Sequence, residues 1–253
     1  MEVAFNYLIV ILAGFVAGMI NTVAGSGSVV TLAALSFMQV PANIANATNR
    51  IGVLVQSFVG FTTYSKHTEV PVKGNVGMLL TIVAGAIVGT LIAVEIDEHL
   101  LKRIIGILMI GMLFLVLTNP KQWLRQSSTD EPLLPVYVRM PLFFLVGIYG
   151  GFIQAGVGIL LLSTMILGSG FHMARANGYK LLIVLLYTIP TLLMFIYADQ
   201  VIWLYGLLLA VGQSVGAYIS ASWASKYPQA PVWIRRLLIV IILLSIPHFL
   251  GFF

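Results

Sequence analysis

Hydrophobic residues dominate the chain in ten runs, which are separated by short polar or glycine-containing breaks. Eight runs reach or approach the roughly 20 residues that a helix needs to cross a bilayer, whereas the second and the seventh are much shorter. The runs cover residues 3–23, 27–39, 44–65, 73–95, 100–118, 137–154, 158–168, 173–197, 201–224 and 233–250. This pattern predicts an all-α polytopic membrane protein with eight long transmembrane helices and two short, broken helices.

The composition supports a lipid environment. Hydrophobic residues make up 60% of the 253 residues and charged residues only 8%, whereas a soluble domain carries about 25% charged residues. No fold keeps so much apolar surface from water, so we expect the bilayer to be the solvent of this chain. The net charge of +5 is then expected to belong to cytoplasmic loops, and nucleic acid is not an expected partner.

Several kinds of chemistry are disfavoured by the residues present. The chain has no cysteine, which excludes disulfides, thiolate metal sites and cysteine nucleophiles. Its four histidines are scattered without the spacing of metal ligands, and no catalytic constellation accompanies Ser26. We therefore expect no metal, no cofactor and no enzymatic activity. All eight carboxylates lie at the ends of runs or in loops, which argues against a buried acid relay and against a cation site.

Short motifs recur in the two halves of the chain in the same order. The matching motifs are Gly14-xxx-Gly18 with Gly147-xxx-Gly151, Ala24–Gly27 with Ala155–Gly158, Ala45–Thr48 with Ala174–Asn177, and Gly85-xxx-Gly89 with Gly212-xxx-Gly216. They predict a duplicated unit of five runs, with residues 1–120 as the first repeat, 121–136 as a cytoplasmic linker and 137–253 as the second repeat. The glycine pairs suit close helix packing, either within a monomer or between monomers of a homo-oligomer.

Basic residues indicate the orientation. If all ten runs cross the membrane, the lysines and arginines split 10 against 3, and if the short runs dip and return, the split is 8 against 5. The ten of the first scheme are Lys66, Lys73, Lys121, Arg125, Arg139, Arg175, Lys180, Lys226, Arg235 and Arg236. The positive-inside rule favours that scheme. Both termini are then expected on the outer side, and the second unit is inverted because five crossings are an odd number.

The two glycine breaks form the candidate substrate site. Inverted-repeat transporters place broken helices near the bilayer midplane, where glycine lets the backbone approach a ligand and helix N-termini favour anions. Intramembrane polar residues are expensive and so indicate function. The candidate substrate-binding residues are Ser26, Gly27, Ser28, Asn46, Asn49 and Arg50 from the first half and Gln154, Gly156, Asn177 and Lys180 from the second. Donors and positive charge without a mid-span carboxylate suit a small anion.

The same stretches resemble the sulfite exporter TauE/SafE family. The similarity is carried by Gly14–Ser28 and Pro41–Gly52 in the first half, and by Gly147–Gly158 and Ala174–Lys180 in the second. The resemblance implies export of a small sulfur-containing anion, such as sulfite or the sulfonate sulfoacetate, across a bacterial-type inner (plasma) membrane. Its partners are then the anionic substrate and the lipid bilayer. The alternative is a membrane-embedded accessory or sensor subunit that binds an anion without transporting it.

Overall fold

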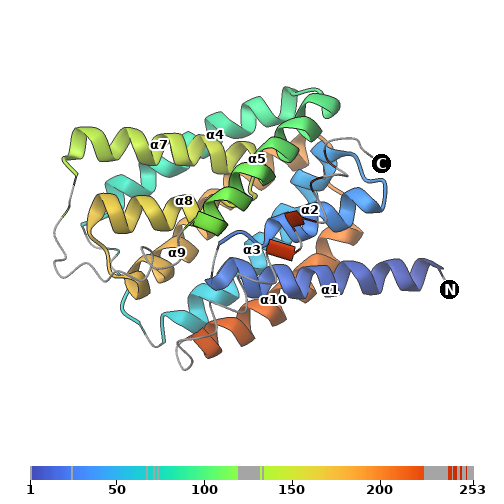
Figure 1. Ribbon diagram of the computed structural model, residues 1–253, viewed down its shortest axis with the longest axis horizontal. Helices are drawn as coiled ribbons and strands as arrows, with labels where there is room; N and C mark the ends of the chain where they lie inside the picture. Colours follow the sequence, from blue (N-terminus) through green and yellow to red (C-terminus); the bar gives the residue numbers. More distant parts are fainter. Residues whose placement is uncertain are drawn as a thin grey trace.

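The computed structural model is a bundle of helices in which the long helices lie side by side (Figure 1). The helices are α1 (Glu2–Val23), α2 (Ser28–Phe37), α3 (Ala42–Tyr64), α4 (Val76–Glu95), α5 (Glu98–Thr118), α7 (Val136–Phe152), α8 (Val157–Ser163), the π-helix η1 (Thr164–Gly168), α9 (Met173–Tyr197) and α10 (Trp203–Ala224). The structure describes residues 2–23, 25–66, 68–70, 72, 74–118, 132, 134–224, 239, 240, 242, 243, 246 and 249. Most of the expected linker 121–136 and of the tenth run, 233–250, therefore lies outside the described residues.

Among the described residues, four helices are long and apolar enough, by length and composition, to cross a bilayer. They are Ala4–Val23, Val76–Glu95, Met173–Tyr197 and Trp203–Ser222. The helix α3 is as long as these, but it carries polar side chains such as Asn46, Asn49 and Arg50, which are buried inside the bundle. The expected number of eight long spans is therefore not reached among the described helices and remains a prediction.

The short helix α2 does not cross the bundle by itself. Its ten residues extend about 15 Å, which is half of a hydrocarbon core of about 30 Å. It begins deep inside, where Gly27 lies against the backbone of Ala17. It ends near the start of α1, because Phe37 and Gln39 share a cavity wall with Asn6. The helices α1 and α2 therefore form a hairpin.

The second half contains a matching hairpin. The amide of Leu134 donates to the carbonyl of Gly168 over 3.0 Å, so η1 ends beside the residues that precede α7. The helices α8 and η1 therefore run back along α7 (Figure 1). The two hairpins open at opposite ends of the bundle.

The hairpins correct the expectation that all ten runs cross. Each hairpin starts and finishes at one end of the bundle, so every loop still lies on the side that the ten-crossing scheme gave it. Lys66, Arg139 and Arg175 mark one end, which we call the basic end. The other end, called the acidic end, carries Glu95 and Asp199 beside further charges of both signs. Six of the basic residues counted from sequence lie outside the described residues, namely Lys73, Lys121, Arg125, Lys226, Arg235 and Arg236.

Two seams rich in glycine join helices from opposite halves of the chain. The first seam packs α1 along α10, and the second packs α4 along α7. Their glycines are Gly14, Gly18, Gly212 and Gly216 in the first seam, and Gly85, Gly89, Gly147 and Gly151 in the second. At each of these glycines the backbone of the partner helix occupies the place of a side chain. The glycine pairs noted in the sequence thus pack within one chain, which decides between the two possibilities left open for them.

Candidate functional site

The two glycine breaks touch each other inside the bundle. Gly25 and Gly156 both adopt a left-handed backbone, with φ of +78° and +77°, a conformation that glycine adopts without strain. The amide of Gly158 donates to the carbonyl of Gly25 over 3.0 Å. A Cβ atom on Gly25 or on Gly158 would overlap the backbone of the other residue. The turns of the two hairpins therefore meet directly, with only backbone between them.

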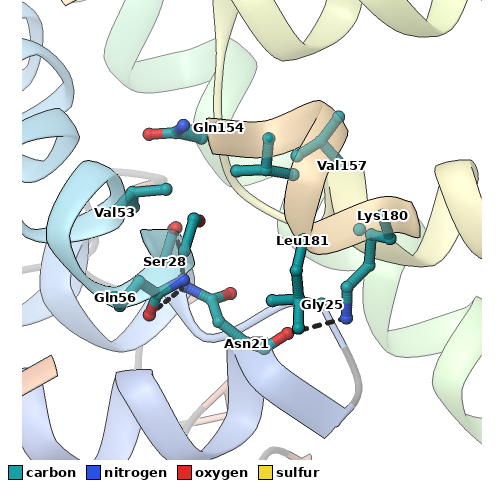
Figure 2. Close-up of a pocket in the computed structure, with 12 residues that line it drawn as sticks. Asn21, Gly25, Ser28, Val53, Gln56, Gln154, Val157, Lys180 and Leu181 are labelled. Atoms are coloured by element: carbon teal, nitrogen blue, oxygen red, sulfur yellow. Dashed lines mark hydrogen bonds between the residues drawn. The ribbon is translucent and has the colours of Figure 1, made fainter. Parts of the chain in front are cut away.

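A small cavity lies beside this contact (Figure 2). Its walls come from both hairpins and from α3 and α9, and all twelve lining residues are buried. They are Asn21, Gly25, Ser28, Val53, Gln56, Ser57, Gln154, Val157, Gly158, Lys180, Leu181 and Val184. The cavity volume of about 20 Å³ is room for about one water molecule. The site is closed in this conformation.

The side chain of Asn21 links three other residues of the first half by hydrogen bonds at one wall of the cavity. Its Oδ1 atom accepts a hydrogen bond from the amide of Gly27, and its Nδ2 atom donates to Ser28 Oγ over 3.4 Å and to Gln56 Oε1 over 3.3 Å. The amides of Gly27 and Gly158 are thus both occupied by protein acceptors. In this conformation the amide of Gly27, which was expected to face a ligand, therefore donates to Asn21, and the polar groups of the cavity wall come from side chains.

Lys180 brings a positive charge to the cavity. Its ammonium donates to the carbonyls of Asn21 and Thr22 over 3.0 and 3.1 Å, and to Asn177 Oδ1 over 2.6 Å. Figure 2 shows the Lys180 side chain reaching toward Asn21 at the cavity wall. Neutral oxygens alone surround the ammonium in these contacts. The carboxylates whose side chains are described, Glu69, Glu95, Asp97, Glu98 and Asp199, are all exposed.

Arg50 is fully buried but lies outside the cavity wall. Its guanidinium donates to the carbonyls of Gly150 and Gly151 at the end of α7, over 3.4 and 2.6 Å, and to Thr191 Oγ1 over 3.0 Å. The guanidinium carbon also lies 4.7 Å from the ring centroid of Phe195, within cation–π range. In this conformation Arg50 therefore holds a helix end.

Asn46 and Asn49 lie outside the cavity wall and bond to neighbouring helices. Asn46 Nδ2 donates to the carbonyl of Phe152 over 2.9 Å. Asn49 Oδ1 accepts from Thr31 Oγ1 and Gln213 Nε2 over 2.7 and 3.2 Å. Of the ten candidate residues, Ser28, Gln154 and Lys180 line the cavity, whereas Ser26, Gly27, Asn46, Asn49, Arg50, Gly156 and Asn177 do not.

Three polar residues line the cavity without being among the ten candidates. They are Asn21, Gln56 and Ser57. Asn21 could have been predicted from the internal repeat. When Gly14 is aligned with Gly147, Asn21 matches Gln154, and it precedes the first glycine break. The Oγ atom of Ser57 is buried and has no hydrogen-bond partner among the described residues, which is consistent with a group kept for a ligand or a water molecule.

Comparisons with known proteins identify the family of the chain. The family model described as sulfite exporter TauE/SafE matches residues 10–248. A probable membrane transporter protein of Sinorhizobium sp., ORF9, is 26% identical over 225 residues, which is 88% of this chain and 85% of that protein.

Two further relatives carry similar names. A probable membrane transporter protein of Haemophilus influenzae is 22% identical over 87% of this chain and 86% of its own length. The probable membrane transporter protein YfcA of Escherichia coli is 28% identical over 83% of this chain and 76% of its own length. No solved structure matches. Because the family model covers nearly the whole chain, the chain belongs to the sulfite exporter TauE/SafE family of membrane transporters.

Proposed function

We propose that the protein exports a small sulfur-containing anion, such as sulfite or the sulfonate sulfoacetate, through the cavity beside the two glycine turns. The observation that carries this proposal is Lys180, a buried cation in a cavity whose other polar residues are amides and serines. An oxyanion needs several N–H and O–H donors and a positive charge to offset its desolvation. The match to the family supports a transporter, and the lining residues favour an anion as its cargo.

We further infer that residues 1–120 and 137–253 are inverted repeats joined by the linker 121–136. The two glycine seams support this inference, because each joins the first run of one half to the fourth run of the other half. The hairpins that open at opposite ends support it as well. Halves related in this way let a transporter present one site to the two sides of the membrane in turn.

Charge gives both the orientation of the protein and the direction in which an anion moves. The positive-inside rule makes the basic end cytoplasmic, which puts both termini outside in a bacterial-type inner membrane. With the cell interior about 100 mV negative, each negative charge that leaves gains about 2.3 kcal/mol. This gradient drives an anion outward without a proton relay, and no carboxylate side chain described in the structure is buried.

The decisive experiment places the purified protein alone in liposomes loaded with sulfite. A potassium gradient with valinomycin sets the membrane potential, and efflux is compared among sulfite, sulfate, sulfoacetate, taurine and thiosulfate. We expect efflux of at least one sulfur oxyanion, faster when the interior is negative. Lys180→Met should abolish efflux. Lys66→Gln, which removes an exposed charge at the basic end, is the matched control and should leave efflux unchanged.

Two results would change the assignment. Binding of an anion without any flux favours the alternative, an accessory or sensor subunit that needs another protein for transport. Efflux that ignores the imposed potential contradicts export driven by the membrane potential.

A further inference from the structure

Two cations are buried in the described part of the chain, Arg50 and Lys180, and each binds the C-terminal end of a helix from the other half. The last four carbonyls of a helix have no partner within it and carry partial negative charge. At the end of α1, the carbonyls of Asn21 and Thr22 accept hydrogen bonds from Lys180 of α9. At the end of α7, the carbonyls of Gly150 and Gly151 accept from Arg50 of α3.

Only one of these two attachments is open to the contents of the cavity. Lys180 lines the cavity together with Asn21, whose carbonyl it holds. Arg50 does not line it and is further fixed by Thr191 and by the ring of Phe195. An anion that enters the cavity therefore meets Lys180 but not Arg50.

The ammonium of Lys180 has three donors, and its three acceptors are neutral oxygens. Hydrogen bonds between two charged groups are about twice as strong as neutral ones, so an oxyanion competes well for these donors. Once the donors turn to the anion, the carbonyls of Asn21 and Thr22 lose their partners in a buried place. The end of α1 must then move to find new partners.

We propose that Lys180 is a latch that the transported anion operates. Without an anion, Lys180 fastens the end of α1 and keeps the cavity closed. With an anion, it moves its hydrogen bonds onto the ligand and releases the α1–α2 hairpin. Lys180 lies about two turns from the start of α9, which is at the basic end, so the release opens the cavity toward that end. This inference rests on the proposed function in one respect, namely that the cavity receives an anion.

The experiment uses the absence of cysteine from the chain. Ser57→Cys puts one thiol on the cavity wall, and Ser65→Cys puts one at an exposed position of the basic end as a control. The proteins are reconstituted in nanodiscs and treated with N-ethylmaleimide, and labelling is followed by intact mass. The probe anions are sulfoacetate and sulfate, compared with chloride at equal ionic strength.

We expect the anion to speed labelling of S57C by about tenfold, within the usual range of coupling between two events. S57C/K180M should label quickly without any anion and gain no further speed from it. S57C/R50K should keep its dependence on the anion, because Arg50 is outside the cavity. The Ser65→Cys control should label at one rate throughout. If S57C/K180M is not monodisperse on size exclusion, S57C/K180R is tested in its place. That variant keeps a positive charge at position 180 and should label slowly in chloride, as S57C does.

The outcomes separate the latch from the transport function. Labelling of S57C that responds neither to the anions nor to K180M overturns the latch, even if liposomes carry out efflux. Labelling that behaves as expected in a protein without flux supports the latch and overturns transport. If neither anion binds, the comparison of S57C with S57C/K180M in chloride still decides whether Lys180 keeps the cavity closed.

Discussion

Lys180 and Arg50 look alike in the sequence, since each is a basic residue about two turns inside a long helix. The structure gives them different surroundings. Lys180 is at the cavity wall, while Arg50 is sealed between the end of α7 and Phe195. Position along the chain predicts depth in the membrane but not which neighbours close around a side chain. The sequence therefore selected both cations as ligand contacts, and the structure places one of them at the cavity.

This difference predicts the effect of Arg50→Lys. A lysine cannot reproduce the fork of donors that Arg50 sends to Gly150, Gly151 and Thr191. A buried carbonyl left without a partner destabilises by about 1–3 kcal/mol, so the melting temperature should fall. The dissociation constant for sulfoacetate should change by no more than about twofold, because Arg50 does not line the cavity.

Thermal unfolding in detergent and a binding titration on the same preparation measure both quantities. A large loss of affinity with unchanged stability would show that Arg50 contacts the ligand after all.

At the scale of elements, the contact between the hairpin turns depends on the absence of side chains. Gly158→Ala places a Cβ atom against the backbone of Gly25. Overpacking of this kind destabilises by about 1–3 kcal/mol, and the expected result is a lower melting temperature together with slower transport. Gly111→Ala is the matched control, since a Cβ atom there meets nothing within 4 Å. That variant should be as stable as the parent or more so, and equal effects of the two substitutions would refute the role given to this contact.

The sequence predicted the elements of the first nine runs and the position of the glycine breaks, because hydrophobic length and glycine spacing are local signals. It did not predict that the short helices fold back along α1 and α7. That choice depends on which faces pack together, and a list of spacings does not contain this information. For the same reason the sequence predicted three polar residues of the cavity wall, Ser28, Gln154 and Lys180. It did not predict the apolar residues of that wall, such as Val53 and Val184.

At the scale of the whole molecule, the described surface separates apolar flanks from charged ends. Large hydrophobic side chains are exposed along the flanks, including Phe5, Leu8, Leu12, Leu80, Leu91, Leu145, Leu193 and Leu207. Soluble monomers do not normally expose such a surface, so we interpret it as the face turned to lipid. Charged residues such as Lys66 and Glu95 lie at the two ends.

This arrangement predicts which end faces the cytoplasm. In a chain without cysteine, Ser65→Cys reports on the basic end and His99→Cys on the acidic end, and both positions are exposed. A membrane-impermeant maleimide should label His99→Cys in intact cells and Ser65→Cys only after the membrane is made permeable. The reverse pattern would invert the proposed orientation and place both termini on the cytoplasmic side.

The backbone bond between Gly158 and Gly25 has a consequence for the kinetics. While this bond holds, the two turns move together, so no unbroken aqueous path opens between them. Solute flow should therefore saturate with concentration and proceed in countable cycles. Patch-clamp records of the reconstituted protein should contain no discrete unitary currents.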